Sequence, residues 1–302
     1  MARRRRGRDV SGWLVVDKPA GIGSTGVVTA VRRALDARKA GHAGTLDPDA
    51  TGVLAVALGE ATKTVPWLQD APKTYRFAVR FGAATATDDA AGEVVATSAE
   101  RPTAGEVEAA LPLFTGDIEQ VPPAYSAVRV EGRRAHMVAR GGGAPDLAPR
   151  PLRVHALSLE GMEDPETAIL LMTCGKGGYV RSVARDLGAA LGGHAHCLRL
   201  RRTRSGPFAA EDGVGMAALE NPAALPLLPL EAAIPEMPRV QATEAGALRL
   251  AHGNPGEAIA AGPAPAYGAE ALAMRDGRAL AIGRWRGGTL HPSRVFAPPV
   301  PE

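Results

Sequence analysis

The sequence predicts an α+β fold in two parts, a mixed, largely antiparallel sheet flanked by helices and then a small β-rich domain. The first part is predicted because strands outnumber helices and do not alternate strictly with them. The second part is set off by proline, since twelve of the 25 prolines lie at or beyond Pro222. We therefore expect a basic disordered tail over residues 1–10, a first domain over 11–222, a Pro-rich linker over 223–238 and a β-rich domain over 239–302.

The first elements follow from hydrophobic periodicity. Residues 13–17 form a short apolar run, which is typical of a strand. Apolar residues spaced three and four apart then predict a helix over residues 24–36, with Ser24 or Thr25 as its N-cap. A second apolar run over residues 53–58 predicts a buried strand. The chain thus begins with a strand, a helix and a strand.

The middle of the chain contains both periods. Tyr75, Phe77 and Val79 alternate with Arg and Ala, which is the period of a strand. Apolar residues along one stripe of residues 179–191 predict the clearest helix of the chain. The same criteria predict a helix over residues 103–114 and strands over 124–130, 152–159 and 168–173.

The C-terminal part has short apolar runs separated by Gly and Pro. Residues 271–274 and 279–283 flank a turn that contains Asp276-Gly277. Asp-Gly is a preferred pair in tight hairpin turns. The pattern predicts a β-hairpin within a small β-rich module.

Composition excludes several classes of protein. Two cysteines in 302 residues do not make a disulfide framework, so a reducing, cytoplasmic location is expected. Apolar runs are far shorter than the roughly 20 residues of a spanning helix, and no signal-peptide core follows the basic N-terminus. A net charge of +3 excludes a histone-like protein. The five arginines of the first eight residues indicate either a disordered tail or an arm that touches phosphate.

Three short motifs are better explained without a ligand. Residues 21–26 have the glycine pattern of a dinucleotide-binding turn, but Pro19 already turns the chain and the residues before Asp47 are loop-like. Residues 194–197 contain two His and one Cys with no spaced Cys/His pair to complete a zinc site, so we predict no metal. Asp88-Asp89 is expected to lie in a solvated loop.

The segment over residues 41–52 is the first candidate site. It places one His and two Asp among Gly and Pro, between a predicted helix and a predicted strand. Asp47 precedes Pro48, which biases its backbone toward an extended conformation. A carboxylate on such a loop suits catalysis. A turn or capping role for Asp47 is equally consistent with the local sequence.

Other segments supply polar partners. Tyr75 places an aromatic hydroxyl in a strand, and Tyr179 and Arg181 begin a helix after a glycine-rich turn. Packing for Tyr179 and a solvated charge for Arg181 are the alternative interpretations. Residues 181–204 hold six arginines and one acidic residue, a net charge of +5. Such a basic stripe is typical of proteins that bind a polyphosphate backbone.

Six motifs occur in one order and spacing: residues 17–21, 41–54, 73–75, 116–127, 175–188 and 200–208. Together they make the chain resemble the bacterial tRNA pseudouridine-55 synthases of the TruB type, over nearly all of its first 220 residues. The resemblance implies a pseudouridine-synthase catalytic domain over residues 11–222 and a PUA-like RNA-binding domain over 239–302.

The resemblance also implies roles for individual residues. Asp47 is expected to be the essential catalytic carboxylate, and Arg181 is expected to pair with it. Tyr75 is expected to stack on the flipped uracil and to handle a proton. Contacts to the substrate or its pocket are implied for four further residues, His42, Tyr179, Leu200 and Lys18.

The implied reaction turns uridine into pseudouridine in the T loop of tRNA. It needs no cofactor, because no electron or group leaves, but the base must be extruded from the RNA. The carboxylate has three routes: attack at C1′, proton removal to give a glycal, and addition at C6. The implied partner is the tRNA T arm, with no membrane, no obligate protein partner and a monomeric enzyme. A non-catalytic RNA-binding or RNA-remodelling module and a guide-RNA-directed synthase are the alternatives.

Overall fold

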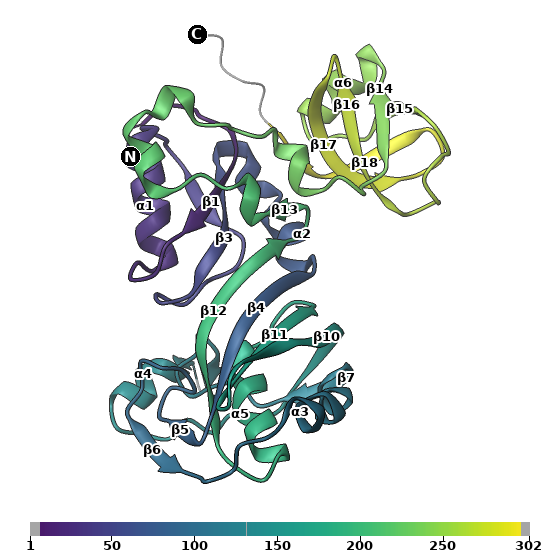
Figure 1. Ribbon diagram of the computed structural model, residues 1–302. Coiled ribbons are helices and arrows are strands. Elements are labelled where there is room, and N and C mark those ends of the chain that lie inside the picture. Colours follow the sequence, from purple (N-terminus) through teal and green to yellow (C-terminus); the bar gives the residue numbers. More distant parts are fainter. Residues whose placement is uncertain (1–6, 131, 297–302) are drawn as a thin grey trace.

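One large sheet organises the first domain of the computed structural model, which describes residues 7–130 and 132–296 (Figure 1). Within these residues nine strands form the sheet, and two short ones, β2 (Ala40–His42) and β13 (Phe208–Ala209), pair with β3 and β12. The other seven lie in the order β1 (Gly12–Lys18), β3 (Thr51–Leu58), β12 (Ala195–Ser205), β4 (Lys73–Phe81), β11 (Thr167–Cys174), β10 (Arg150–Asp164) and β7 (Gly116–Gln120). Only β12 and β3 pair in parallel, so the predicted mixed, largely antiparallel sheet is confirmed.

Helices pack on both ends of this sheet. Those before β12 are α1 (Ser24–Ala34), η1 (Gly59–Lys63), α2 (Val65–Asp70), α3 (Ala104–Ala110), η2 (Leu111–Phe114), α4 (Ala135–Arg140) and α5 (Val180–Ala190). α1 packs on β1 and β3 through Val27 and Val31. α3 and α5 pack on β4, β10 and β11 through residues such as Val107 and Leu187. Figure 1 shows the long strands β4 and β12 joining the two ends. No described helix is long and apolar enough to span a bilayer.

The strands β1 and β3 are buried on both faces. Trp13 and Val15 pack into one cluster with Phe208, whereas Leu14 and Val16 pack into another with α1. A strand covered on both faces has no solvated side, so its sequence reads as an apolar run. This explains why residues 13–17 and 53–58 predict strands without a period-two pattern.

Three local predictions need correction. Residues 124–128 form no strand, because Ser126 and Val128 accept backbone hydrogen bonds from the start of α4; only β8 (Arg129–Val130) forms, paired with β9 (Arg133–Arg134). The helix predicted over 103–114 changes from α3 to the 3-10 helix η2 where Pro112 enters. The N-cap of α1 is Gly23, since the Ser24 hydroxyl is bonded elsewhere.

The C-terminal β-rich domain is a closed barrel. It contains β14 (Arg239–Ala242), β15 (Gly256–Ala260), β18 (Thr289–Val295), β17 (Arg278–Trp285) and β16 (Glu270–Arg275), with α6 (Glu244–Ala251) packed on them. The predicted hairpin is confirmed as β16–β17, and both Asp276 and Gly277 have positive φ, at 50° and 72°. The indole of Trp67 on α2 donates a 2.9 Å hydrogen bond to Glu270, which ties the barrel to the first domain.

The described part of the predicted tail and the predicted linker are both held against the first domain. Residues 1–6 of the tail lie outside the described residues. Arg8, by contrast, pairs with the 36–38 turn, where its N–H donates to Asp36 and its carbonyl accepts from Arg38, so disorder does not extend to this part. In the segment after Pro207, Leu228 exchanges two 2.8 Å backbone hydrogen bonds with Trp13. Short 3-10 helices fill this segment: η3 (Ala210–Asp212), η4 (Met216–Glu220), η5 (Pro222–Ala224) and η6 (Leu230–Ala233).

A smaller two-stranded sheet, β5 (Ala83–Thr85) with β6 (Val94–Thr97), projects from the end of β4. The turn between its strands carries Asp88 and Asp89. That turn lies over the start of β12, because the Cys197 N–H donates to the Asp88 carbonyl. This turn therefore lies close to the candidate catalytic residues, which are described in the next subsection.

Candidate active site

The loop between β2 and β3 holds Asp47 in a fixed position. On one side of it, the buried Ser24 hydroxyl accepts a hydrogen bond from the Leu46 N–H at 2.8 Å and donates to the Leu46 carbonyl at 2.9 Å. On the other side, the Pro48 carbonyl accepts from the Lys18 ammonium at 2.7 Å and from the Gly21 N–H at 3.0 Å. Both neighbours of Asp47 are therefore tied to the β1–α1 connection.

Arg181 meets Asp47 from the first turn of α5. Its Nε lies 2.9 Å from Asp47 Oδ2, and its other nitrogens donate to the carbonyls of Thr87 and Tyr125 at 3.0 and 3.1 Å. The Arg181 side chain is 7% exposed and that of Asp47 is 40% exposed. The arginine is thus a rigid, buried partner, whereas the carboxylate keeps one side open.

Burial raises the pKa of Asp47, and the charge of Arg181 opposes that rise. The neighbouring carboxylate of Asp89 adds to the rise, and Lys18 opposes it more weakly. Desolvation and a nearby cation act in opposite directions on a carboxyl group. The ionised form of Asp47 therefore depends on its arginine partner.

Asp88 and Asp89 do not lie in a solvated loop, so that prediction is wrong. Asp89 Oδ2 is 3.5 Å from Arg181, and Asp88 Oδ2 is 2.9 Å from Arg185. Burial raises the pKa of Asp88, and Arg185 opposes this. Arg181 and Arg185 are four residues apart, so they share one face of α5. Two arginines on one helix face favour acidic partners nearby, and this spacing could have suggested Asp88 and Asp89 from the sequence.

Tyr75 lies on β4 between its cross-strand neighbours Met172 on β11 and Arg202 on β12. It is half-buried and packs against the core of that half of the sheet, as does Leu200. Burial raises the pKa of the Tyr75 phenol, and the charge of Arg202 lowers it. The charge of Asp47 also raises this pKa, so the two groups interact across the site.

Tyr179 is the N-cap residue of α5 and is fixed by Gln120. Its N–H donates to the Gln120 side chain at 2.8 Å, and its carbonyl accepts from the same amide at 3.0 Å. Burial raises the pKa of its phenol, on which the charges of Arg181 and Asp47 also act. Tyr179 therefore belongs to the same constellation as Asp47 and Tyr75.

His42 and Lys18 lie at the edge of this constellation. His42 ends β2, and burial together with the charge of Arg202 lowers its pKa, so the imidazole is neutral near pH 7. The Lys18 side chain is fully buried and its ammonium donates to three carbonyls, those of Pro19, Ile22 and Pro48. Lys18 therefore holds the Asp47 loop through the Pro48 carbonyl, and it has no exposed donor for a ligand.

Two family models match consecutive parts of the chain. Residues 32–180 match the family model described as TruB family pseudouridylate synthase (N terminal domain), and residues 181–234 match the tRNA pseudouridylate synthase B C-terminal domain. The chain belongs to the TruB family of pseudouridine synthases. It is therefore an enzyme, an isomerase.

Relatives of this TruB family member match over nearly their full length. The tRNA pseudouridine synthase B of Cereibacter sphaeroides is 58% identical, with 98% of this chain and 99% of the relative covered. That of Ruegeria pomeroyi is 57% identical, with 99% and 100% covered. A chain of the solved "Structure of H/ACA RNP bound to a substrate RNA containing 2'-deoxyuridine" has a TM-score of 0.72 at 23% identity and covers 99% of this chain and 92% of that chain. This last likeness shows a shared fold.

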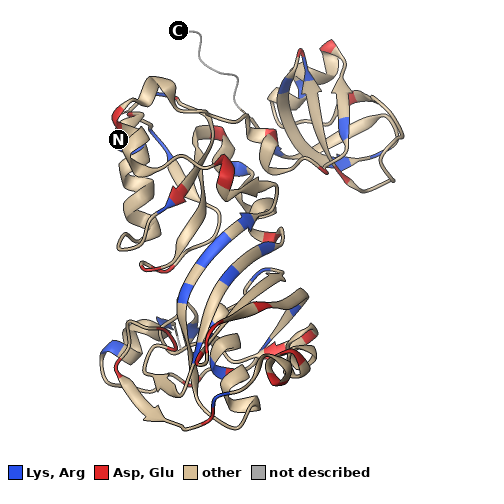
Figure 2. Ribbon diagram, viewed as in Figure 1, with Lys and Arg blue, Asp and Glu red and all other residues tan. Residues whose placement is uncertain are grey.

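Most arginines of the basic stripe, residues 181–204, are engaged by other residues of this TruB-type enzyme and are not free to bind phosphate. Figure 2 shows basic residues along β12 and the adjacent β4. Residues 181–204, all of which are described, contain six arginines, and four of these form ion pairs with carboxylates. Arg202 is buried, and Arg204 has no carboxylate partner among the described residues. The pairs are Arg181–Asp47, Arg185–Asp88, Arg199–Glu163 and Arg201–Asp17.

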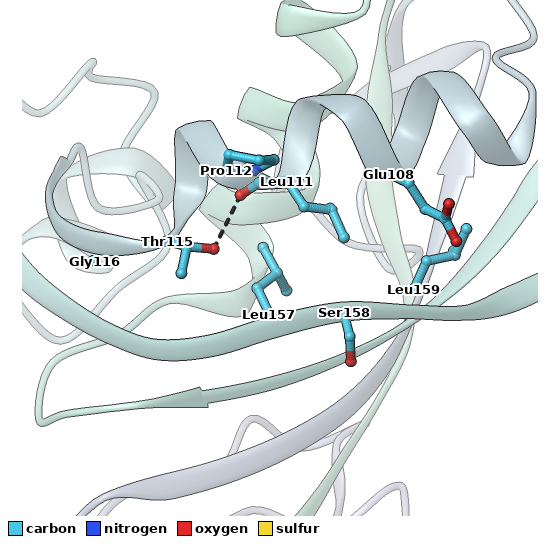
Figure 3. A pocket seen from close by; sticks show the side chains of 8 residues that line it. All are labelled: Glu108, Leu111, Pro112, Thr115, Gly116, Leu157, Ser158 and Leu159. Atoms are coloured by element: carbon cyan, nitrogen blue, oxygen red, sulfur yellow. Dashed lines mark hydrogen bonds between the residues drawn. The ribbon is translucent and has the colours of Figure 1, made fainter.

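A separate cavity lies away from these residues. It has a volume of about 620 Å3 and lies between the end of α3, η2 and β10 (Figure 3). Leu111, Pro112, Leu157 and Leu159 form its apolar wall, and none of the predicted site residues lines it. In the described part of the chain no three His, Cys, Asp or Glu side chains come together as metal ligands.

Proposed function

We propose that this enzyme converts uridine to pseudouridine in the T loop of tRNA, at position 55, and that Asp47 starts the reaction. The names of the full-length relatives support tRNA as the substrate. The observation that carries the catalytic assignment is the 2.9 Å ion pair between Arg181 and Asp47, in which the carboxylate is half-exposed and the arginine is buried. An oriented carboxylate with one open side can reach a sugar or a base that enters the site.

The other site residues have roles in this proposal that fit their positions. The target nucleotide leaves the RNA stack and enters the space beside Asp47. Tyr75 supplies an aromatic face that holds the detached uracil while it turns, and its protonated phenol handles a proton. Tyr179, Leu200 and His42 shape the pocket and hold the displaced nucleotide.

All three routes open to Asp47 begin with an ionised carboxylate, because attack at C1′, proton removal from C2′ and addition at C6 each need an electron pair. Arg181 therefore serves each of them by opposing the effect of burial on the pKa of Asp47. tRNA labelled with deuterium at C2′ of the target uridine separates the second route, since only that route breaks the C2′–H bond. The reaction conserves all atoms and electrons, so the proposal includes no cofactor. We further propose that the enzyme acts as a monomer in the cytoplasm.

The deciding experiment incubates the purified full-length protein with an unmodified tRNA transcript, without guide RNA or added protein, and maps pseudouridine. We expect one modified uridine, in the T loop. Asp47→Asn is expected to abolish turnover and to retain tRNA binding, because the amide keeps the size of the side chain but lacks its charge. Asp49→Asn is the matched control, since Asp49 is an exposed carboxylate on the same loop.

The outcomes separate the parts of the proposal. An unmodified T loop with the wild-type protein overturns the substrate assignment. Full activity of Asp47→Asn overturns the role of Asp47. Loss of activity in Asp49→Asn to the same extent would show that charge on the loop, and not the Asp47 carboxylate, is what matters.

A further inference from the structure

Arg202 is a buried arginine with no acidic partner. Its residue is 1% exposed, and it is among the largest fully buried side chains of the described residues. Within residues 7–130 and 132–296 no carboxylate lies within ion-pair distance of it, unlike Arg201 beside it, which pairs with Asp17. A buried charge is costly unless its hydrogen bonds are satisfied. The partners of Arg202 are therefore informative.

Those partners are main-chain carbonyls on both sides of Asp47. Arg202 Nε donates to the Val53 carbonyl at 2.8 Å. Its Nη2 donates to the Gly44 carbonyl at 3.1 Å, and its Nη1 lies 3.5 Å from the Thr45 carbonyl. Gly44 and Thr45 precede Asp47, and Val53 follows it on β3. One guanidinium thus joins the two ends of the loop that presents the catalytic carboxylate.

The backbone of Arg202 lies between that loop and Tyr75. Arg202 pairs in parallel with Gly52 on β3 and opposite Tyr75 on β4. The approach to β3 is so close that a Cβ on Gly52 would stand 2.1 Å from the Arg202 carbonyl oxygen. The Arg202 charge also lowers the pKa of the Tyr75 phenol. Arg202 therefore donates to the loop that carries Asp47 and lies opposite Tyr75, the two residues assigned to the reaction.

We propose that Arg202 is a positioning residue, which fixes the Asp47 loop relative to Tyr75 by donating to the carbonyls of Gly44, Thr45 and Val53. This inference rests on the roles proposed above for Asp47 and Tyr75. The three acceptors diverge around a planar fork, which a guanidinium satisfies and a lysine ammonium cannot. Charge alone is not sufficient in this position.

The test compares Arg202→Lys, Arg202→Met and the control Arg201→Met in single-turnover assays with saturating enzyme, alongside the Kd for tRNA and the midpoint of thermal unfolding. We expect a rate about 100-fold lower for Arg202→Met and about 10-fold lower for Arg202→Lys, since small displacements of a catalytic group have effects of this size. The Kd for tRNA is expected to stay within about threefold, because Arg202 has no exposed donor for RNA. Arg201→Met is expected to keep the wild-type rate, since Arg201 donates to the part-exposed carboxylate of Asp17 and to no carbonyl of the Asp47 loop.

Several results would overturn the proposal. A rate within about threefold of wild type for a folded Arg202→Lys or Arg202→Met excludes a positioning role at this level. An equal loss of tRNA affinity and rate would indicate a binding role, and rate loss that follows only the unfolded fraction would indicate a purely structural one. Arg202→Lys decides the question if Arg202→Met does not fold. An inactive wild-type protein would instead refute the proposed function, so the two failures are distinguishable.

Discussion

Arg181→Met is the sharpest test of how the site keeps Asp47 ionised. Methionine fills much of the arginine stem but removes the charge and the hydrogen bond to Asp47 Oδ2, which is 2.9 Å long. Burial raises the pKa of Asp47 and Arg181 lowers it, so the substitution leaves the burial effect unopposed by its main partner. The pKa of Asp47 must then rise.

The energy lost with the Arg181 side chain follows from the geometry of the pair. Two unit charges about 4 Å apart interact by about 4 kcal/mol at an effective dielectric constant of about 20. The Asp47 side chain is 40% exposed, so water screens the pair. We therefore retain about 1 kcal/mol for the lost charge interaction. Loss of one charge-assisted hydrogen bond adds about 1.5–3 kcal/mol to the barrier, or about a 10- to 100-fold lower rate.

The assay is the single-turnover rate of pseudouridine formation at saturating enzyme between about pH 5 and about pH 8.5. We expect the acid limb of the Arg181→Met profile to lie at higher pH than that of wild type, and we expect the rate above it to reach a lower plateau. An unmoved acid limb with a wild-type plateau would refute the reasoning. Arg185→Met is the matched control, since Arg185 lies on the same face of α5 but pairs with Asp88 and Asp186. Its acid limb is expected to stay in place.

Two further predictions concern stability. Gly52→Ala should lower the free energy of unfolding in urea by about 2–4 kcal/mol, because φ is +98° and the new Cβ would meet the Arg202 carbonyl. Gly215→Ala, whose Cβ meets nothing within 4 Å, should be nearly neutral, and equal effects would contradict this account. Burial lowers the pKa of Lys73 to about 8 from 10.5. Because the unfolded chain keeps the Lys73 proton to higher pH, the free energy of unfolding of wild type should rise by about 2–3 kcal/mol relative to that of Lys73→Met between pH 8 and pH 10.5. A difference in this free energy that stays constant over the same pH range would contradict the lowered pKa.

Local patterns predicted much of the fold and the centre of the site. The helix at 179–191 and the turn at Asp276-Gly277 depend on periodicity and turn chemistry, which act over a few residues. Asp47 was recognisable because it precedes Pro48 in a loop rich in glycine, and the family motifs favoured a catalytic over a capping interpretation. The pairing of Arg181 with Asp47 came from the resemblance and is seen in the structure.

The remaining parts depend on contacts between distant segments. Arg202 lies in an alternating apolar and basic stretch, which reads as half-solvated, yet its Nε partner Val53 is 149 residues away in sequence. Asp88 and Asp89 read as loop residues until the sheet brings their turn to α5. The strand predicted over 124–130 forms only at Arg129–Val130, because the carbonyls before it accept hydrogen bonds from the nearby start of α4 and from the distant Arg181. For Arg202, Asp88 and Asp89 the partner that decides the conformation lies far along the chain.

Three cations surround the Asp47 loop and share one property. Lys18, Arg181 and Arg202 are 0%, 6% and 1% exposed, and each donates to main-chain carbonyls around the loop or the turn beside it. Carbonyls are neutral, so they satisfy the hydrogen bonds of Lys18 and Arg202 without cancelling the charges, whereas Arg181 also pairs with the carboxylate of Asp47. Arg181 and Lys18 oppose the rise in the Asp47 pKa, and Arg202 acts on the phenol of Tyr75.

These cations lie too deep to contact phosphate, so part of the basic character that indicates RNA binding in the sequence serves a different purpose here. Burial around a carboxylate raises its pKa and so opposes the ionised form that the proposed reaction needs. Buried cations oppose this rise in the pKa without filling the open side of Asp47. Surface arginines can be removed with effects on tRNA affinity and its salt dependence. Removal of a buried one changes the rate and its pH profile, which makes the Arg181→Met profile the measurement that separates the two uses of arginine in this enzyme.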